Sequence, residues 1–316
     1  MTSLLILRRM RVENANAVSG LVYGFPAITH FLGYVHALSR DLQTKLGEAC
    51  QLGGCAVICH KHEIQAHRTA GWGDCQFSLT KNPLTKTGEA APFNEEGRIH
   101  LEVSLVIECK FTVDDLPFDH ATIEEDKEAL EELVYGYALK RPLAGGRIIS
   151  LNRTKGVKFE QIGREDEKNE KLGRLIRSLL PGFLLRDRSD LFKKHLTDHP
   201  HLNPLDALLD FYTLKSAASR PKEEAPSEKK IKWSSLAKPA GGWLVPIQIG
   251  YKAISPLYRP GEVANARDPH QPFRFVEPIY GIGEWMGVHC IRNLEALRET
   301  FWRYGHENET YLCKSM

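Results

Sequence analysis

The stretch Arg98-Ile-His-Leu-Glu-Val-Ser-Leu-Val-Ile-Glu-Cys-Lys-Phe111 decides the fold of this chain. Every second side chain in it is apolar, at Ile99, Leu101, Val103, Leu105 and Ile107. That spacing is the period of a β-strand with one face buried against a core. We therefore predict a strand over residues 98–111.

The neighbouring segments complete a recognisable order of elements. Residues 4–12 and 53–65 are rich in Leu, Ile and Val and predict two buried strands, whereas residues 28–42 carry apolar side chains at helical spacing. We expect an acidic helix at 122–139 and a further strand at 147–151. The resulting order β, α, β, hairpin, β, α, β is typical of ferredoxin-like domains. The predicted fold class is α+β, with an RRM-like (ferredoxin-like) core.

The core would occupy residues 1–160 and include a long polar insert at 70–97, between the two middle strands. A connection of this length inside a compact domain is usually functional. We expect it to project as a hairpin, or thumb, that docks on a partner; the alternative is a hairpin folded back over its own sheet. Residues 161–215 predict a helical insertion, the charged residues 216–240 a flexible linker, and residues 241–316 the C-terminal part of the core.

Composition excludes several classes of protein. The chain has 316 residues and is 42% hydrophobic, which is enough for a substantial core. No apolar run approaches the length of a transmembrane helix, and the N-terminus lacks the order of a secretory signal. Seven cysteines, an odd number, imply no disulfide framework. We expect a cytoplasmic protein with no membrane partner and no cofactor.

Charge is distributed unevenly along the chain. Lys and Arg total 42 against 40 Asp and Glu, a net charge of +2. Residues 140–194 alone hold fifteen Lys or Arg and seven Asp or Glu, a surplus of eight, so the rest of the chain carries about −6. Such a split indicates a surface that faces a polyanion.

The cluster Cys55, Cys59, His60 and His62 invites a metal hypothesis. Structural zinc sites place ligand pairs two residues apart on tight turns, whereas these cysteines are separated by three residues on a predicted strand. Strand alternation would put the two thiols on one face and both imidazoles on the other. We therefore predict no metal site. The same histidines and His100 are candidate bases of a ribonuclease, but no catalytic pattern accompanies them, and we predict no catalytic residue.

The run from Gly250 to Trp285 alternates aromatic and basic residues. Aromatic rings stack on unpaired bases and arginines contact phosphates, which together favour single-stranded nucleic acid as a ligand. In the alternative interpretation half of the aromatic residues belong to the core and the arginines pair with nearby carboxylates. Gly281 and Gly283, within the same run, predict a tight turn from strand to helix.

Nine stretches match one known family: Val12-Glu-Asn-Ala-Asn-Ala-Val18, Gly24-Phe-Pro-Ala27, His36-Ala-Leu38, Asn82-Pro-Leu84, Glu96-Gly-Arg-Ile-His-Leu-Glu-Val-Ser-Leu105, Leu143-Ala-Gly-Gly146, Leu179-Leu-Pro-Gly-Phe183, Gly242-Trp-Leu-Val-Pro-Ile247 and most of 255–285. They resemble the subunit of type I-F CRISPR surveillance complexes (the Csy, or I-F Cascade, assembly) that holds the 5′ handle of the guide RNA. The resemblance implies a non-catalytic protein that binds crRNA through an RRM-like core.

The resemblance also implies partners. These are the large subunit, the backbone subunits, which the thumb would contact, and target double-stranded DNA through the assembled complex. The RNA-binding residues expected from the sequence are Asn14, Asn16, Lys81, Asn82, Arg98, Arg147, Tyr258, Arg259, Asn265, Arg267, Arg274 and Trp285. Two other functions stay open: an RRM-fold endoribonuclease with a histidine base, and a pure protein–protein assembly module.

Overall fold

The computed structural model describes residues 2–68, 73–77, 79–80, 83–91, 94–118, 120–163, 165–219 and 231–315. Its helices are α1 Ile28–Leu46, α2 Ile123–Lys140, α3 Glu165–Ser178, α4 Ser189–Asp198, α5 Pro204–Leu209 and α6 Leu294–Arg298, with short 3₁₀ turns η1 Val113–Asp115 and η2 Val288–Cys290. The strands of its main antiparallel sheet are β1 Thr2–Asn16, β4 Leu52–Ile64, β9 Arg98–Cys109, β10 Arg147–Ser150, β11 Val157–Ile162, β12 Phe183–Asp187, β15 Trp243–Ala253, β16 Val276–Gly287, β17 Trp302–Glu307 and β18 Thr310–Ser315. None of the described helices is long and apolar enough to cross a membrane.

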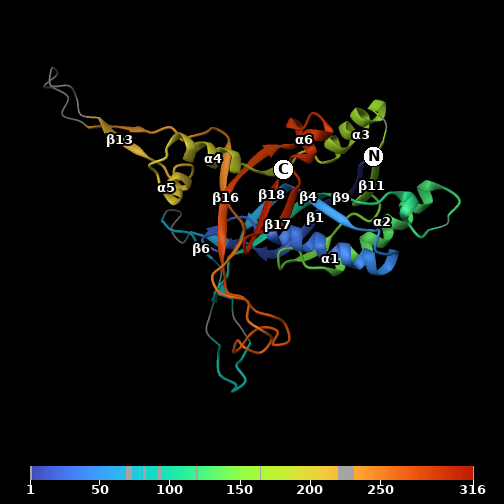
Figure 1. Cartoon of the computed structure of the whole chain (residues 1–316), viewed down its shortest axis with the longest axis horizontal. Helices are drawn as coiled ribbons and strands as arrows, with labels where there is room; N and C mark the ends of the chain where they lie inside the picture. Colours follow the sequence, from blue (N-terminus) through green and yellow to red (C-terminus); the bar gives the residue numbers. More distant parts are fainter. Residues whose placement is uncertain are drawn as a thin grey trace.

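The N-terminal half of the sheet has the order β10–β1–β9–β4, with β11 also paired to β1. The strands predicted at 4–12, 53–65, 98–111 and 147–151 are all present, as are the helices predicted at 28–42 and 122–139. α1 and α2 both pack on one face of these strands, against the alternating apolar side chains of β9. Figure 1 shows the two helices together on one side of the sheet.

The opposite face of the sheet is covered only in part. Leu4, Ile6, Ala56, Ile58 and Val106 point away from α1 and α2 and pack against α3 and α6, which lie above the sheet in Figure 1. Towards the beginning of β9 this cover ends, and Arg98 and His100 are half-buried rather than buried. The uncovered part of this face is therefore available to a ligand.

The C-terminal strands curl the sheet back on itself. Beyond β4 the order is β12–β16–β15–β18–β17. The last of these strands, β17, pairs with β4, with Trp302 opposite Cys55, so that the strand order returns to its starting point. The fully buried Trp302 indole Nε1 donates a hydrogen bond to the Leu185 carbonyl of β12, 2.8 Å away. The strands from β4 to β17 therefore form a ring, which we call the strand ring, with Leu185, Ile247, Ile249, Trp302 and Cys313 in the core that it surrounds.

Two elements of the main sheet differ from their prediction. The helical segment expected at 161–215 is interrupted by β12, which pairs with β4 on one side and β16 on the other. Gly281 and Gly283 lie inside β16 rather than in a turn. A Cβ at Gly281 would come within 2.8 Å of the Ile249 side chain. The missing side chains therefore let β16 approach the core of the strand ring.

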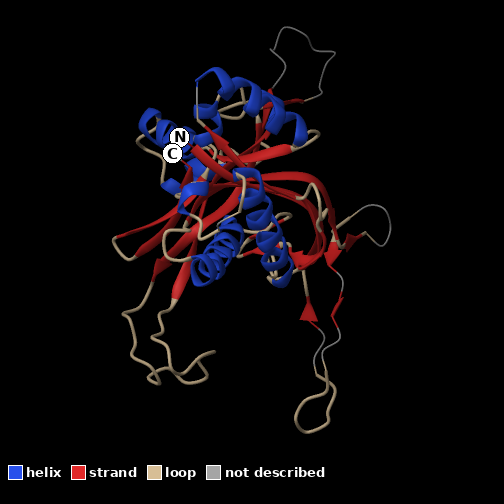
Figure 2. Cartoon of the chain, turned by 90° about the vertical axis from the view of Figure 1, so that its right-hand side faces the viewer, coloured by secondary structure: helices blue, strands red, loops and turns tan. Residues whose placement is uncertain are grey.

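Two segments project from the same end of the molecule. One is the insert, in which β5 Ala66–His67 pairs with β6 Gln76–Phe77, and β7 Leu79–Thr80 with β8 Asn94–Glu95. The other is the loop 254–275 between β15 and β16. Figures 1 and 2 show both extending away from the sheet in the same direction, and Figure 2 shows a gap between them. The described residues of the insert therefore extend away from the sheet.

The segment predicted as a linker contains a short hairpin. β13 Ser216–Ser219 and β14 Lys232–Ser235 pair in an antiparallel ladder, which extends away from the body in Figure 1. Residues 220–230 lie outside the described residues. Trp233 is 69% exposed on this hairpin.

Candidate nucleic-acid interface

The uncovered face of the sheet carries a row of polar side chains on β1, on β9 and along the last part of β4 and the residue that follows it. We call it the polar strip, and it consists of Arg9, Asn14, Lys61, Gln65, Arg98, His100 and Glu102. The backbone N–H of Asn14 lies 3.2 Å from His100 Nδ1, and Gln65 Nε2 lies 2.9 Å from Asn14 Oδ1. Arg98 reaches the Asn14 carbonyl at 3.3 Å. The structure therefore brings two of the predicted RNA contacts, Asn14 and Arg98, into one network.

Glutamates neutralise the cations of the strip. Arg98 pairs with Glu96 at 2.5 Å, Arg9 with Glu102 at 2.5 Å, and Lys61 with the same Glu102 at 3.9 Å. These pairs are partly exposed, and such pairs contribute at most about 1 kcal/mol each. A phosphate can therefore compete for the guanidinium groups at small cost.

His60 sits where the strip meets the covered part of the sheet. Its Nδ1 lies 2.7 Å from the Pro181 carbonyl, which can only accept, so Nδ1 carries the proton. Its Nε2 then accepts from the Ser104 hydroxyl at 2.6 Å. Burial is the main cause that lowers the pKa of this imidazole, opposed by the bond to Pro181. Both ring nitrogens of His60 are occupied, so neither is free to take a proton from a ribose hydroxyl.

The prediction for the Cys/His cluster was wrong about His62. The register of β4 against β9 slips between Cys59 and Lys61, because a β-bulge lies there. Cys59 opposes Val103 and His62 opposes Leu101, so both face the α1 side of the sheet. No group of three or more potential metal ligands occurs among the described residues. Burial also raises the pKa of Cys55 and Cys59 to about 12, which keeps both thiols protonated.

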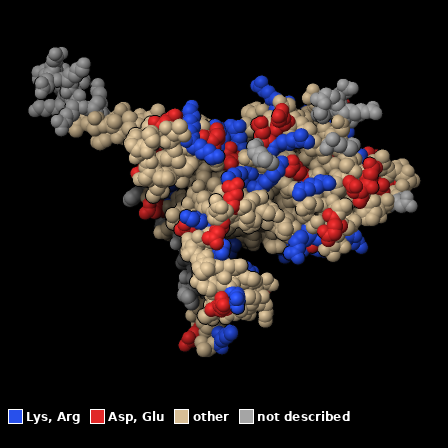
Figure 3. Space-filling model, in the orientation of Figure 1, with Lys and Arg blue, Asp and Glu red and all other residues tan. Residues whose placement is uncertain are grey.

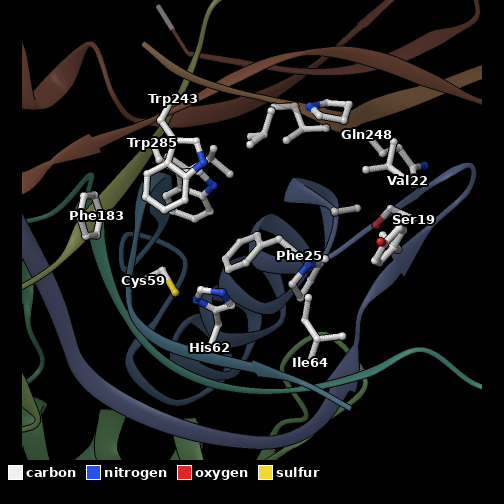
Figure 4. A pocket seen from close by; sticks show the side chains of 18 of the residues that line it. Ser19, Val22, Phe25, Cys59, His62, Ile64, Phe183, Trp243, Gln248 and Trp285 are labelled. Carbon is white, nitrogen blue, oxygen red and sulfur yellow. The ribbon is translucent and has the colours of Figure 1, made fainter. Parts of the chain in front are cut away.

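An aromatic cavity of about 400 Å³ opens at one end of the strand ring. Phe25 meets Trp285 edge to face with 4.9 Å between ring centres, and Phe183 meets Trp243 in the same way at 5.3 Å. Figure 4 shows these rings around the cavity, with Cys59, His62 and Ile64 on the β4 side. The predicted contact Trp285 therefore lies in this cavity, and not with the arginines of the 254–275 loop.

The 254–275 loop holds the other predicted contacts of the C-terminal run. Tyr258 bridges to Phe273, and its ring packs edge to face on Phe275. Asn265 adopts a left-handed turn with φ of 58°. Arg259 and Arg267 are exposed, and neither guanidinium has an ion-pair partner among the described residues. Arg274, in contrast, pairs with Glu309 at 3.2 Å.

The remaining predicted contacts fall in three places. Asn16 caps its own turn, because its Oδ1 accepts from the Val18 N–H at 3.0 Å. Arg147 is exposed and opposes Glu13 in the β1–β10 ladder. Lys81 and Asn82 lie outside the described residues.

The positive surplus of residues 140–194 does not form one basic surface. Its arginines and lysines are spread over several elements, and many have acidic partners: Arg141 with Asp41, Arg153 with Glu132, Lys158 with Glu131, Arg174 with Glu170, and both Arg186 and Arg188 with Glu284. On the face shown in Figure 3 positive and negative side chains are interspersed. The positive charge of this segment is therefore dispersed over several elements, whereas the side chains of the strip lie together in one network.

Comparison with known proteins agrees with the sequence motifs. The family model described as CRISPR-associated protein (Cas_Csy2) matches residues 5–313. The chain belongs to the Csy2 family. A curated relative, the CRISPR-associated protein Csy2 of Pseudomonas aeruginosa (strain UCBPP-PA14), is 40% identical over 324 aligned positions, covering 99% of this chain and 94% of the relative. Membership of the Csy2 family confirms the resemblance that the motifs indicated.

Sequence reasoning missed several residues of this interface. Gln65 and His100 join the network of the strip, and Phe25, Phe183 and Trp243 line the cavity. Phe183 and Trp243 are 46% and 53% exposed. Both lie in the motifs Leu179–Phe183 and Gly242–Ile247, whose aromatic residues were the available signal. Their convergence depends on pairing between distant strands.

Proposed function

We propose that this Csy2-family protein is a non-catalytic subunit of a type I-F CRISPR surveillance complex that binds the 5′ handle of the guide RNA. The observation that carries the proposal is the polar strip, where Asn14, Arg98 and His100 meet on an uncovered part of the sheet face. Amide, imidazole and guanidinium groups there offer donors to phosphates and to base edges. The exposed Arg259 and Arg267 add a second positively charged contact.

We propose further that the N-terminal half is an RRM-like (ferredoxin-like) core. Numbered along the chain, its four main strands lie in the order fourth, first, third, second, and its two helices share one face. That arrangement is typical of ferredoxin-like domains. RRM domains bind RNA on the sheet face opposite the helices, and the polar strip occupies that face.

The geometry favours binding over cleavage. Both nitrogens of His60 are hydrogen-bonded, and both nitrogens of His100 lie within 3.2 Å of a polar neighbour. His62 faces the aromatic cavity. A general base needs a nitrogen free to approach the ribose hydroxyl.

The two projections support the proposed protein partners. A thumb that extends from the sheet presents its surface to a neighbouring backbone subunit rather than to its own core. The large subunit would share the guide RNA, and target double-stranded DNA would be reached only through the assembled complex.

Labelled repeat RNA tests the proposal directly. Incubation with the purified chain should give a retarded complex and no cleavage products. Cleavage would favour the endoribonuclease, and the absence of both binding and cleavage would favour a pure assembly module.

A further inference from the structure

We propose that the aromatic cavity at the end of the strand ring receives one unpaired base of the bound RNA. This inference rests on the proposed RNA-binding function and adds a specific site to it. The cavity volume, about 400 Å³, lies within the range of pockets that hold small organic molecules, and such pockets often lie at the mouths of closed strand arrangements.

The walls of the cavity suit a flat ring. Trp243 and Trp285 oppose each other in the β15–β16 ladder, and Phe25 stands nearly perpendicular to Trp285, at 85°. Phe183 and Trp243 remain about half exposed, so parts of their ring faces are not covered by contacts within the chain. Aromatic faces left open in this way stack on nucleobases.

A buried hydroxyl in the lining lacks a partner. Ser19 lies between Val18 and Gly20 in the short hairpin of β2 Val18–Ser19 and β3 Val22–Tyr23, and it is only 4% exposed. Its Oγ has no hydrogen-bond partner among the described residues, although Ser19 lines the cavity (Figure 4). A buried polar atom without a partner is costly. A ligand with a polar edge removes that cost.

The β2–β3 hairpin is held in place from outside. The N–H of Leu21, at its tip, donates to the Tyr280 hydroxyl of β16 at 2.7 Å. A Cβ at Gly20, which has φ of 60°, would overlap that hydroxyl at 2.1 Å. The backbone that carries Ser19 is therefore anchored to β16 before any ligand binds.

A base matches both the aromatic walls and the unpartnered Ser19 hydroxyl, whereas an apolar protein side chain matches only the walls. Leu or Phe from a partner would fill the aromatic walls but offer nothing to Ser19 Oγ. A nucleobase has a π face for the rings and a hydrogen-bonding edge for Ser19, with Gln248 and His62 also in the lining.

The cavity and the polar strip share the end of β4. Ile64 lines the cavity, and the next residue, Gln65, belongs to the strip and donates its N–H to the Arg98 carbonyl at 2.8 Å. Ile64 opposes Ile99 and faces the α1 side of the sheet, whereas the strip lies on the other face, so the two surfaces approach each other only where β4 ends. An RNA whose phosphates lie on the strip passes around this end of β4, where an unstacked base can turn into the cavity.

The test measures binding of the full chain to single-stranded repeat RNAs in which one nucleotide at a time is abasic. One position should lower affinity about tenfold in wild type, the loss typical of one stacked base. Trp243→Ala should cause a similar loss with unmodified RNA and no further loss with that abasic RNA. The matched control, Trp233→Ala on the β13–β14 hairpin, should change neither. Ser19→Ala should alter the preference among the four bases at that position only.

The outcomes separate the inference from the function on which it rests. If wild type binds none of the RNAs, both fail. If wild type binds with normal salt dependence but Trp243→Ala lowers affinity equally for every abasic RNA, only the cavity inference fails. Loss of large-subunit binding by Trp243→Ala, with RNA binding intact, would place a protein side chain in the cavity instead. A melting curve checks the folding of each variant, and Trp243→Phe should retain most of the affinity.

Discussion

The Ser104 hydroxyl of β9 donates a hydrogen bond of 2.6 Å to His60 Nε2 on the neighbouring strand β4. The same Ser104 oxygen accepts from the Arg9 N–H of β1 at 2.9 Å. His60 Nδ1 in turn donates a hydrogen bond to the Pro181 carbonyl. One buried hydroxyl thus joins three strands to the segment that leads into β12, at the boundary between the covered and uncovered parts of the sheet.

The His60 imidazole should make stability depend on pH. Burial lowers its pKa in the folded protein, whereas in the unfolded chain the pKa of His is about 6.5. The unfolded state therefore takes up the proton first, and stability is lost as the pH falls through about 6.5 towards the lower folded value. Urea denaturation between pH 8 and 5 should show a smaller loss for His60→Gln than for wild type. Burial also lowers the pKa of His30, but His30 is present in both proteins, so the difference isolates His60. Equal losses would contradict the prediction.

Arg98 should contribute one phosphate contact. The logarithm of RNA affinity should fall linearly with the logarithm of salt concentration, and Arg98→Gln should reduce the slope by about 0.7, the value for one contact on a single strand. Arg153→Gln is the matched control, because Arg153 is exposed and pairs with Glu132 of α2. Filter-binding titrations at several salt concentrations measure both slopes. A slope reduced equally by both variants would show that only diffuse charge is involved.

Shortening the insert should affect assembly but not folding. The described hydrogen bonds of its tip are local, such as those between Thr85 and Glu89, whereas Phe77 at its base packs against Tyr23. Replacing residues 80–93 by a Gly–Ser turn should leave the melting temperature unchanged and prevent joining of backbone subunits on guide RNA. Size-exclusion chromatography of the reconstituted complex reports assembly. Normal assembly would leave the insert without the proposed role.

Trp302 should stabilise the strand ring through its indole N–H. Trp302→Phe keeps the aromatic packing but leaves the buried Leu185 carbonyl without its donor, which should cost about 1–3 kcal/mol in the free energy of unfolding. Trp233→Phe, on the exposed hairpin, should cost less than about 0.5 kcal/mol. Urea denaturation at one pH compares the two, and similar values for both would show that the bond carries no net stability.

The cysteines should divide into reactive and protected groups. Burial raises the pKa of Cys55, Cys59 and Cys313 to about 12, so almost no thiolate forms at pH 8. Cys75 and Cys290 are exposed. Iodoacetamide should modify these two first in the native protein and all seven after denaturation, as mass spectrometry can show. Early modification of Cys55 would mean that the strand ring opens readily.

Local pattern predicted the elements of the N-terminal half well. The alternation in β9 is visible because only one of its faces is apolar near Arg98, and the helical spacing in α1 is uninterrupted. β12 was not predicted because it has only five residues and follows Pro181 and Gly182. Its strand conformation depends on β4 and β16, which are distant in sequence.

The site was less predictable than the fold. Asn14 and Arg98 were found through motifs, but the orientation of His62 depends on a bulge that no local period reveals. The cavity requires Ser19, Phe183 and Trp243 to converge from three separate segments. A single sequence shows which residue types are present, but not which of them become neighbours in the folded chain.

The late return of β17 to β4 has a consequence for synthesis on the ribosome. The N-terminal strands and helices can pair as they emerge, but the edge of β4 at Cys55 waits for Trp302, which is translated much later. Until then that edge exposes unpaired backbone groups, which attract incorrect partners. A chain that terminates early keeps the open edge and remains a target for chaperones and proteases. Closure of the ring therefore distinguishes chains that already contain β17 from shorter ones.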